Sequence, residues 1–354
     1  MPRSDVDLHG NAGATASRQG PPAGSSSAGL DALQDSASRI RANVERVIEG
    51  KPEVVRIALV VLLAEGHLLI EDVPGVGKTM LAKSLARSLD CSVRRIQFTP
   101  DLLPSDVTGV SIFDQESREF EFKPGAVFAN VVVGDEINRA SPKTQSALLE
   151  AMEERQVSVD GVTYVLETPF MVIATQNPIE MEGTYPLPEA QRDRFTARVS
   201  MGYPSSAAEL RMLESHGAAE PIHDLEPVAD ALEVRKLIEV VRSIHVAPEI
   251  QQYIVDLLTA TRTSSELRLG ASPRAGLQLL RASRASAALD GRDYVLPDDV
   301  QRLASSVLAH RLLPSAEAQV SRGTAEQVVA TLLERTPLPG SASAARSTAG
   351  ARRR

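Results

Sequence analysis

The sequence is poor in cysteine and in aromatic residues. Cys91 is the only cysteine and tryptophan is absent, so no disulfide can form within the chain, which is typical of proteins in a reducing compartment. Aromatic residues make up 3% of the chain, whereas 43% of its residues are hydrophobic. We therefore expect a cytoplasmic protein with mainly aliphatic cores, in which any local cluster of aromatic residues is informative.

Long apolar runs and an excess of basic residues are also lacking. The most apolar run, residues 54–70, is interrupted by Arg56, Glu65 and His67, so it is poorly suited to crossing a bilayer. The start of the chain has no apolar signal core. The formal net charge is −8, so there is no overall basic surface for nucleic acid. These features argue against membrane insertion and against nucleic acid as a partner.

The six histidines show no metal-ligand spacing. His67 and His245 lie in apolar surroundings, and we predict that both are buried core residues. No zinc site is therefore expected.

Composition and periodicity divide the chain into five segments. Residues 1–32 and 337–354 are rich in small and polar residues and are expected to be disordered tails. Residues 33–203 alternate apolar strands with helices, which predicts a parallel sheet with helices on both faces. A mixed connector at 204–230 precedes a segment, 231–336, with helical patterns alone. The sequence thus predicts an α/β domain followed by a small all-α domain.

An aromatic cluster lies near residues 99–128, within the α/β domain. Five of the seven phenylalanines fall between positions 98 and 128, and two short strand patterns there predict an inserted hairpin. Phe120 and Phe122 share one face by the period-two alternation of a strand. That face could dock on its own domain, on a neighbouring subunit or on a client protein.

One stretch, which follows an apolar strand pattern, reads Glu-Asp-Val-Pro-Gly-Val-Gly-Lys-Thr, residues 71–79. A loop with Gly75 and Gly77 lets main-chain N–H groups surround phosphate oxygens, and the helix that follows adds a positive dipole. Lys78 would reach the β- and γ-phosphates of ATP, and the Thr79 hydroxyl would bind Mg²⁺. The usual pattern G-x-x-x-x-G-K-[ST] fails at its first position, which is Asp72.

Polar side chains follow the next two apolar strand patterns. Asp135 would hold Mg²⁺ through water, and Glu136 would polarise the water that attacks the γ-phosphate. Asn177 follows the next core strand and could orient the same water. Open α/β sheets bind ligands at the carboxyl ends of their strands, so these residues are expected near the phosphate loop.

Three arginines are candidates for phosphate contacts. Arg192 and Arg194 lie near the end of the first domain, and an arginine presented to a neighbour's γ-phosphate can contribute roughly 10³–10⁵ in rate. Arg274 opens a helix of the second domain after Ser272 and Pro273, where a cation opposes the helix dipole. An anion such as a bound phosphate is therefore expected beside Arg274.

Taken together, these stretches resemble the MoxR family of AAA+ ATPases over residues 35–335. Five segments carry the resemblance: Glu-Asp-Val-Pro-Gly-Val-Gly-Lys-Thr (71–79), Gly-Asp-Glu-Ile-Asn-Arg-Ala (134–140), Lys-Thr-Gln-Ser-Ala-Leu-Leu-Glu-Ala-Met-Glu-Glu-Arg-Gln-Val (143–157), Ala-Thr-Gln-Asn-Pro (174–178) and Gly-Ala-Ser-Pro-Arg-Ala (270–275). The resemblance implies an AAA+ αβα nucleotide-binding domain with a helix-2 insert near 99–128, followed by a helical lid domain.

The resemblance also implies roles for individual residues. Glu136 and Asp135 belong to Walker B, Asn177 is sensor 1, Arg274 is sensor 2, and the finger that acts on the neighbouring subunit maps best to Arg194. Whether Arg192 is the finger instead stays open. The implied nucleotide-binding residues are Ile48, Gly50, Pro74, Gly75, Val76, Gly77, Lys78, Thr79, Met80, Asp135 and Arg274, of which Thr79 and Asp135 hold Mg²⁺.

The function implied by the resemblance is ATP hydrolysis to ADP and phosphate by a ring, expected to be a hexamer. Such a motor would remodel or mature client proteins, often with a von Willebrand factor A domain partner. One alternative is a nucleic-acid or chelatase-type motor, because related clades share the insert, although the acidic charge argues against DNA. Another is a nucleotide-gated scaffold with negligible turnover, against which Glu136 and the two candidate fingers argue. The client cannot be read from the sequence.

Overall fold

The computed structural model describes residues 23–177, 184–215, 221–320 and 323–339. The expected tails therefore lie largely outside the described residues. Helix α1 (Ala23–Glu45) begins well before Leu33, where order was expected to start, and its Leu30 is buried. Order thus begins earlier than the sequence indicated.

A five-stranded sheet forms the centre of the first domain. Its strands are β1 (Leu68–Glu71), β3 (Val93–Gln97), β6 (Val131–Asp135), β9 (Met171–Gln176) and β10 (Ala197–Val199). They lie in the order β10-β1-β9-β6-β3, and every neighbouring pair is parallel. All residues of β6 and β9 are buried, as expected for central strands covered on both faces. The carboxyl ends of the strands consequently share one edge, and their amino ends share the other.

Helices cover both faces of this sheet, which confirms the predicted fold class. The helices of the first domain after α1 are α2 (Pro52–Leu63), α3 (Lys78–Arg87), α4 (Pro104–Thr108), α5 (Pro142–Glu154) and α6 (Glu189–Arg192). Leu68 and Ile70 of β1 point into one apolar cluster with α1, α2 and α3, whereas Leu69 points into the other cluster with α5. Because side chains alternate along a strand, β1 contributes to the apolar clusters on both faces of the sheet.

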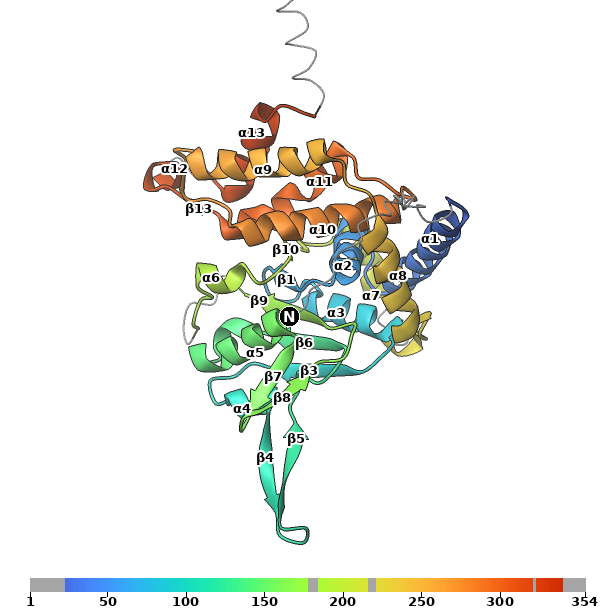
Figure 1. Cartoon of the computed structure of the whole chain (residues 1–354), viewed down its shortest axis with the longest axis vertical. Coiled ribbons are helices and arrows are strands. Elements are labelled where there is room, and N and C mark those ends of the chain that lie inside the picture. The colour runs from blue at the N-terminus through green and yellow to red at the C-terminus, as the bar shows by residue number, and fades with distance from the viewer. Residues whose placement is uncertain (1–22, 178–183, 216–220, 321–322, 340–354) are drawn as a thin grey trace, which may run out of the picture.

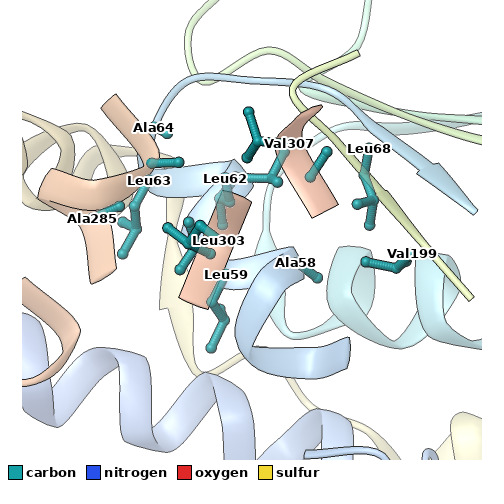
Figure 2. Packing of buried hydrophobic residues seen from close by; sticks show 14 of the residues in the cluster. Ala58, Leu59, Leu62, Leu63, Ala64, Leu68, Val199, Ala285, Leu303 and Val307 are labelled. Atoms are coloured by element: carbon teal, nitrogen blue, oxygen red, sulfur yellow. The ribbon is translucent and has the colours of Figure 1, made fainter. Parts of the chain in front are cut away.

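Most of the second domain is a helical layer above the first, whereas its first helix lies beside the first domain, next to α1 (Figure 1). Its helices are α8 (Ala231–Ser243), α9 (Pro248–Thr263), α10 (Pro273–Leu289), α11 (Pro297–Leu308), α12 (Ala316–Val320) and α13 (Ala325–Arg335). Figure 2 shows Leu303 and Val307 of α11 and Ala285 of α10 packed near Leu59 and Leu62 of α2. The lid therefore shares one continuous apolar core with the first domain.

The lid and the connector also contain elements that the sequence did not indicate. Strands β12 (Leu267–Leu269) and β13 (Leu313–Pro314) form a short antiparallel pair, so the lid is not purely helical. Helix α7 (Ser206–Ser215) lies in the connector, and β11 (Ala229–Asp230) at its end pairs with β2 (Leu89–Asp90). These strands have two or three residues each, too few to show a periodic pattern.

A hairpin of β4 (Gly109–Asp114) and β5 (Glu119–Pro124) projects from the end of the molecule opposite the lid (Figure 1). Beside its base lies a second hairpin, β7 (Gln156–Val159) and β8 (Val162–Val165). Phe122 stacks on Tyr164 of β8 with ring centroids 3.9 Å apart, whereas Phe120 is 74% exposed and contacts the ring of Phe113. The two phenylalanines therefore differ, and only Phe122 docks on its own domain.

None of the helices in the described residues is long and apolar enough to cross a membrane.

Candidate functional site

The phosphate loop lies at the carboxyl end of β1 and leads directly into α3. Gly75 and Gly77 have φ values of +80° and +90°, a left-handed conformation that favours glycine, and Gly77 is the N-cap of α3. The Lys78 ammonium donates to the main-chain carbonyl of Gln176 (3.0 Å) and to that of Asp72. Lys78 thus lies where β1 and β9 end. It is also the first residue of α3, whose N-terminus is suited to binding phosphate.

Asp72 has a structural role where the usual pattern has glycine. Its carboxylate accepts hydrogen bonds from the Ser200 hydroxyl (2.7 Å) and from the N–H groups of Gly202 (2.6 Å) and Val73 (2.7 Å). Burial favours the neutral acid, but these hydrogen bonds prevail and lower the pKa of Asp72. The backbone at Asp72 is not left-handed, so glycine is not required there. The carboxylate ties the loop to the segment after β10.

Thr79 and Asp135 meet as the sequence indicated. The Thr79 hydroxyl donates to Oδ1 of Asp135 (2.8 Å), and Asp135 is buried at the end of β6. This hydroxyl and carboxylate fit Mg²⁺, which prefers oxygen ligands. The other carboxylate oxygen of Asp135 accepts from Nε of Arg95 (2.7 Å). A cation already neutralises Asp135 in this structure.

Glu136 follows in an unusual backbone conformation. Its φ of +59° is left-handed, which costs a non-glycine residue roughly 1–3 kcal/mol. Its N–H donates to the Thr175 hydroxyl (3.0 Å), which also lies 3.3 Å from Oδ1 of Asp135. Its carboxylate accepts from Nε2 of Gln97 (2.9 Å) and lies 3.3 Å from Nε of Arg139. These contacts hold the carboxylate at the same edge as Lys78.

The contacts of Arg95, Gln97, Arg139 and Thr175 were all missed from the sequence. Arg95 and Gln97 lie on β3, which neighbours β6 only because of the strand order. Thr175 is the second-last residue of β9, the neighbour of β6 on its other side. A polar residue near the end of an apolar strand was the available signal, but strand order could not be read from the sequence.

The remaining predicted residues of this edge are Asn177 and the segment around Gly50. Asn177 is buried directly after β9, and its carbonyl accepts from Nδ2 of Asn138 (3.3 Å). Ile48 and Val76 belong to the same apolar cluster, against which Met80 packs. Gly50 has a left-handed φ of +71°.

The next residue, Lys51, donates to the carbonyl of Tyr203 (3.0 Å). Since Asp72 binds Gly202, residues 48–51 and the start of the loop both contact the segment after β10. Pro74 and Gly75 of the loop are exposed. The predicted nucleotide-binding residues Ile48 and Gly50 and the phosphate loop are therefore neighbours in the fold.

Arg194 and Arg274 lie elsewhere, at the amino edge of the sheet. They line a cavity of about 240 Å³ together with Glu153 at the end of α5 and with residues before β1, among them His67. From His67, before β1, to Asp72, after it, the extended chain advances five residue steps, or about 16 Å. Arg274 is thus separated from the phosphate loop of its own subunit. The anions beside it are Glu153 and Asp193, the latter at 3.9 Å.

The two candidate fingers differ in their surroundings. Arg194 donates from Nε to Oε2 of Glu153 (2.8 Å) and lines the cavity. Arg192 lies 3.9 Å from Glu189, and its Nε is buried without a hydrogen-bond partner among the described residues. Arg192 is absent from the cavity lining. The geometry favours Arg194 as the residue able to meet an anion there.

Asp193, which lies between these arginines in the sequence, links residues 192–194 to the lid. It accepts from the hydroxyl of Ser272, the N-cap of α10 (3.0 Å), and from Nε of Arg311 (2.8 Å). Arg311 is buried and also donates to the carbonyl of Phe195. Burial lowers the pKa of Arg311 to about 10, with Asp193 opposing the shift, so it stays charged at neutral pH. Residues 192–194, the start of α10 and Arg311 of the lid therefore form one connected unit.

Comparison with known proteins gives matches over both domains. The description "ATPase family associated with various cellular activities (AAA)" matches residues 67–197, and "AAA lid domain" matches residues 259–332. "Chaperone MoxR1" of Mycobacterium tuberculosis is 40% identical over 339 residues, which cover 93% of this chain and 89% of that protein. "Uncharacterized protein YeaC" of Bacillus subtilis is 49% identical over 304 residues, covering 86% of this chain and 95% of that protein.

A solved structure from Cytophaga hutchinsonii extends the comparison to three dimensions. It superposes with a TM-score of 0.82 at 35% identity and covers 89% of this chain and 98% of that one. The shared sequence, the sheet and the helical lid lead to one conclusion: the chain belongs to the MoxR family of AAA ATPases.

Proposed function

We propose that this protein hydrolyses ATP to ADP and phosphate in a ring in which each nucleotide site is completed by the next subunit. One observation carries the proposal: the polar residues form two groups at opposite edges of the same sheet. Lys78, Asp135 and Glu136 lie at the carboxyl edge, and Arg194 and Arg274 line the cavity at the amino edge. One subunit cannot bring both groups to one phosphate, whereas two adjacent copies can.

The residues at the carboxyl edge of the sheet bind the nucleotide and supply the catalytic base. The ammonium of Lys78 offsets the charge of the β- and γ-phosphates, and the N-terminus of α3 adds main-chain donors. Glu136 polarises the attacking water, which Asn177 orients, and such a base contributes roughly 10²–10⁴ in rate. Thr79 and Asp135 would hold Mg²⁺, which offsets phosphate charge when bound. Arg194 of the next subunit supplies positive charge to the γ-phosphate.

The work done with ATP is proposed to be remodelling or maturation of a client protein by a hexameric ring. A relative named "Chaperone MoxR1" supports this role, as does the exposed aromatic pair on the β4–β5 hairpin. A von Willebrand factor A domain protein is the proposed partner. An acidic chain of net charge −8 offers less support for a nucleic-acid motor.

Mixing two inactive variants tests the shared site. Glu136→Gln should bind ATP but turn it over roughly 10²–10⁴ times more slowly. Arg194→Ala should bind ATP as an isolated subunit and lose hydrolysis, because its finger serves the neighbour. In an equal mixture about a quarter of the interfaces pair an intact base with an intact finger, so up to about a quarter of wild-type activity should return.

The control is each variant alone, measured at the same total subunit concentration by phosphate release. Formation of mixed rings is checked by co-purification of differently tagged variants. If mixed rings form and no activity returns, Arg194 acts within its own subunit or is structural. Arg192→Ala then becomes the variant to test.

A further inference from the structure

We propose that Glu153 is a positioning residue that holds Arg194 and Arg274 together for the nucleotide of the neighbouring subunit. Its Oε2 accepts from Nε of Arg194 (2.8 Å), and its Oε1 accepts from Nη2 of Arg274. One carboxylate thus joins an arginine of the first domain to an arginine of the lid. The inference rests on the proposed shared site, and it adds a residue that would not itself touch the nucleotide.

The charge balance of the cavity explains why a carboxylate is needed there. Four arginines line the cavity, Arg155, Arg194, Arg274 and Arg281, against two glutamates, Glu65 and Glu153. Arg155 is paired with Glu65 through a 2.8 Å contact, so of the two carboxylates that line the cavity it is Glu153 that pairs with Arg194 and Arg274. Converging guanidinium groups repel each other, and a shared counter-charge reduces that repulsion. Two positive charges remain in excess, which suits an incoming polyphosphate.

The donor atoms support positioning rather than simple neutralisation. Arg194 reaches Glu153 through Nε, which leaves both terminal nitrogens for the bidentate contact that arginine makes with phosphate. Arg274 is held from two sides, by Glu153 and by Asp193, whose nearest contact with it measures 3.9 Å. Both guanidinium groups are therefore restrained before a phosphate arrives. This restraint removes part of the entropy cost of ordering long side chains.

Glu153→Gln tests the proposal because it keeps the shape of the side chain and removes its charge. We expect ATP binding by isolated subunits and the melting temperature to stay near wild type, while kcat of the ring falls about tenfold or more. A displacement of about 1 Å in a positioned group can cost on the order of 10² in rate. Glu154→Gln is the matched control: it makes the same charge change at the exposed next residue of α5 and should retain wild-type kcat.

Mixing experiments distinguish positioning from a general structural defect. Glu153→Gln mixed with Glu136→Gln should recover activity, because the first variant keeps its base and the second keeps its arginines and Glu153. Glu153→Gln mixed with Arg194→Ala should recover none, since both changes damage the same side of the interface. The double variant Arg194→Ala, Glu153→Gln should lose less kcat than the product of the two single losses, because part of the effect of Glu153 passes through Arg194.

Three outcomes would overturn the proposal. They are wild-type kcat in Glu153→Gln, recovery in its mixture with Arg194→Ala, and a loss of kcat in Glu154→Gln as large as in Glu153→Gln. If Glu153→Gln has a lowered melting temperature, Glu153→Asp is measured as well, because it keeps the charge on a shorter side chain. Its kcat should lie between those of wild type and Glu153→Gln. Failure of the Glu136→Gln and Arg194→Ala mixture would instead reject the shared site itself.

Discussion

At the scale of single residues, burial decides the charge state of His67, and two hydrogen bonds fix its tautomer. The Val172 N–H donates to Nδ1 (3.0 Å), so Nε2 carries the proton and donates to the Met152 carbonyl (3.1 Å). Burial lowers the pKa of His67 to about 4, and the bond to Met152 and the charge of Arg155 act in opposite directions on it. His67 is therefore a neutral core residue, as predicted.

This histidine should make the protein less stable in mild acid. Because the pKa of His67 is lower in the folded state than its usual 6.5, its contribution to stability is complete above pH 6.5 and is lost between pH 6.5 and about 4. The free energy of unfolding should fall by up to about 1.4 kcal/mol per pH unit from this group. Denaturant titrations at several pH values in this range measure the slope.

The variant His67→Gln should show a shallower slope than wild type. Part of the slope should remain, because burial and the nearby charge of Arg311 also lower the pKa of His310. His245→Gln is the control, since His245 is exposed and the prediction that it is a core residue was wrong. Equal slopes in His67→Gln and wild type would contradict the assignment.

Residues of the loop edge could be predicted where sequence neighbours define them. Lys78 and Thr79 follow a glycine loop, and Asp135 follows an apolar strand, so the site signal is local. Gln97 and Thr175 could not be found in this way, because their contacts depend on which strands are adjacent. The place of Arg274 could not be predicted either, since it depends on how the lid packs.

At the scale of elements, the β4–β5 hairpin combines a docked base with an exposed outer part. Phe122 at its base stacks on Tyr164 and contacts Phe128. Further out, Phe113 and Phe120 contact each other with centroids 5.3 Å apart, and they are 49% and 74% exposed. A hairpin of two strands cannot bury such an apolar face by itself. The outer pair is therefore the part suited to contact another protein.

The double variant Phe113→Ser, Phe120→Ser should keep the basal ATPase rate and melting temperature of wild type. It should bind an unfolded model polypeptide such as labelled casein at least tenfold more weakly, as measured by fluorescence anisotropy. Phe122→Ser is the contrasting variant: loss of its stacking should lower the free energy of unfolding by about 1 kcal/mol or more. Wild-type casein binding by the double variant would show that the outer hairpin is not a contact surface.

Helices and strands with a clear apolar pattern in the sequence were predicted, and those without one were missed. Strands β6 and β9 are largely apolar and are the two apolar strand patterns predicted before Asp135 and Asn177; their signal is strong because each is buried on both faces. The start of α1 was missed because Ala23–Gly29 is composed of small residues, which suit a tail as well as a helix. The short strands β12 and β13 form only because the lid brings them together.

At the scale of the whole molecule, the two groups of polar residues would make nucleotide a component of the subunit interface in the proposed ring. Lys78→Ala should abolish ATP binding, because it removes the cation from the β- and γ-phosphates. It should therefore also abolish any assembly that depends on ATP, as measured by sedimentation velocity with and without nucleotide. Lys236→Ala, at an exposed position on α8, should bind and assemble as wild type. ATP affinity in Lys78→Ala equal to wild type would reject the loop assignment.

The position of α5 has a consequence for communication around such a ring. The helix begins shortly after Glu136 and ends at Glu154, next to Glu153, so its 13 residues span about 20 Å. In the proposed ring, one end of α5 follows the catalytic Glu136 in the chain, and the other end lines the cavity proposed to receive the nucleotide of the neighbour. A shift of α5 in response to the phosphate in its own subunit would move Glu153, and with it the arginines that contact the nucleotide of the neighbouring subunit. Signals would then pass in a single rotational sense, from site to site, without any long-range change of fold.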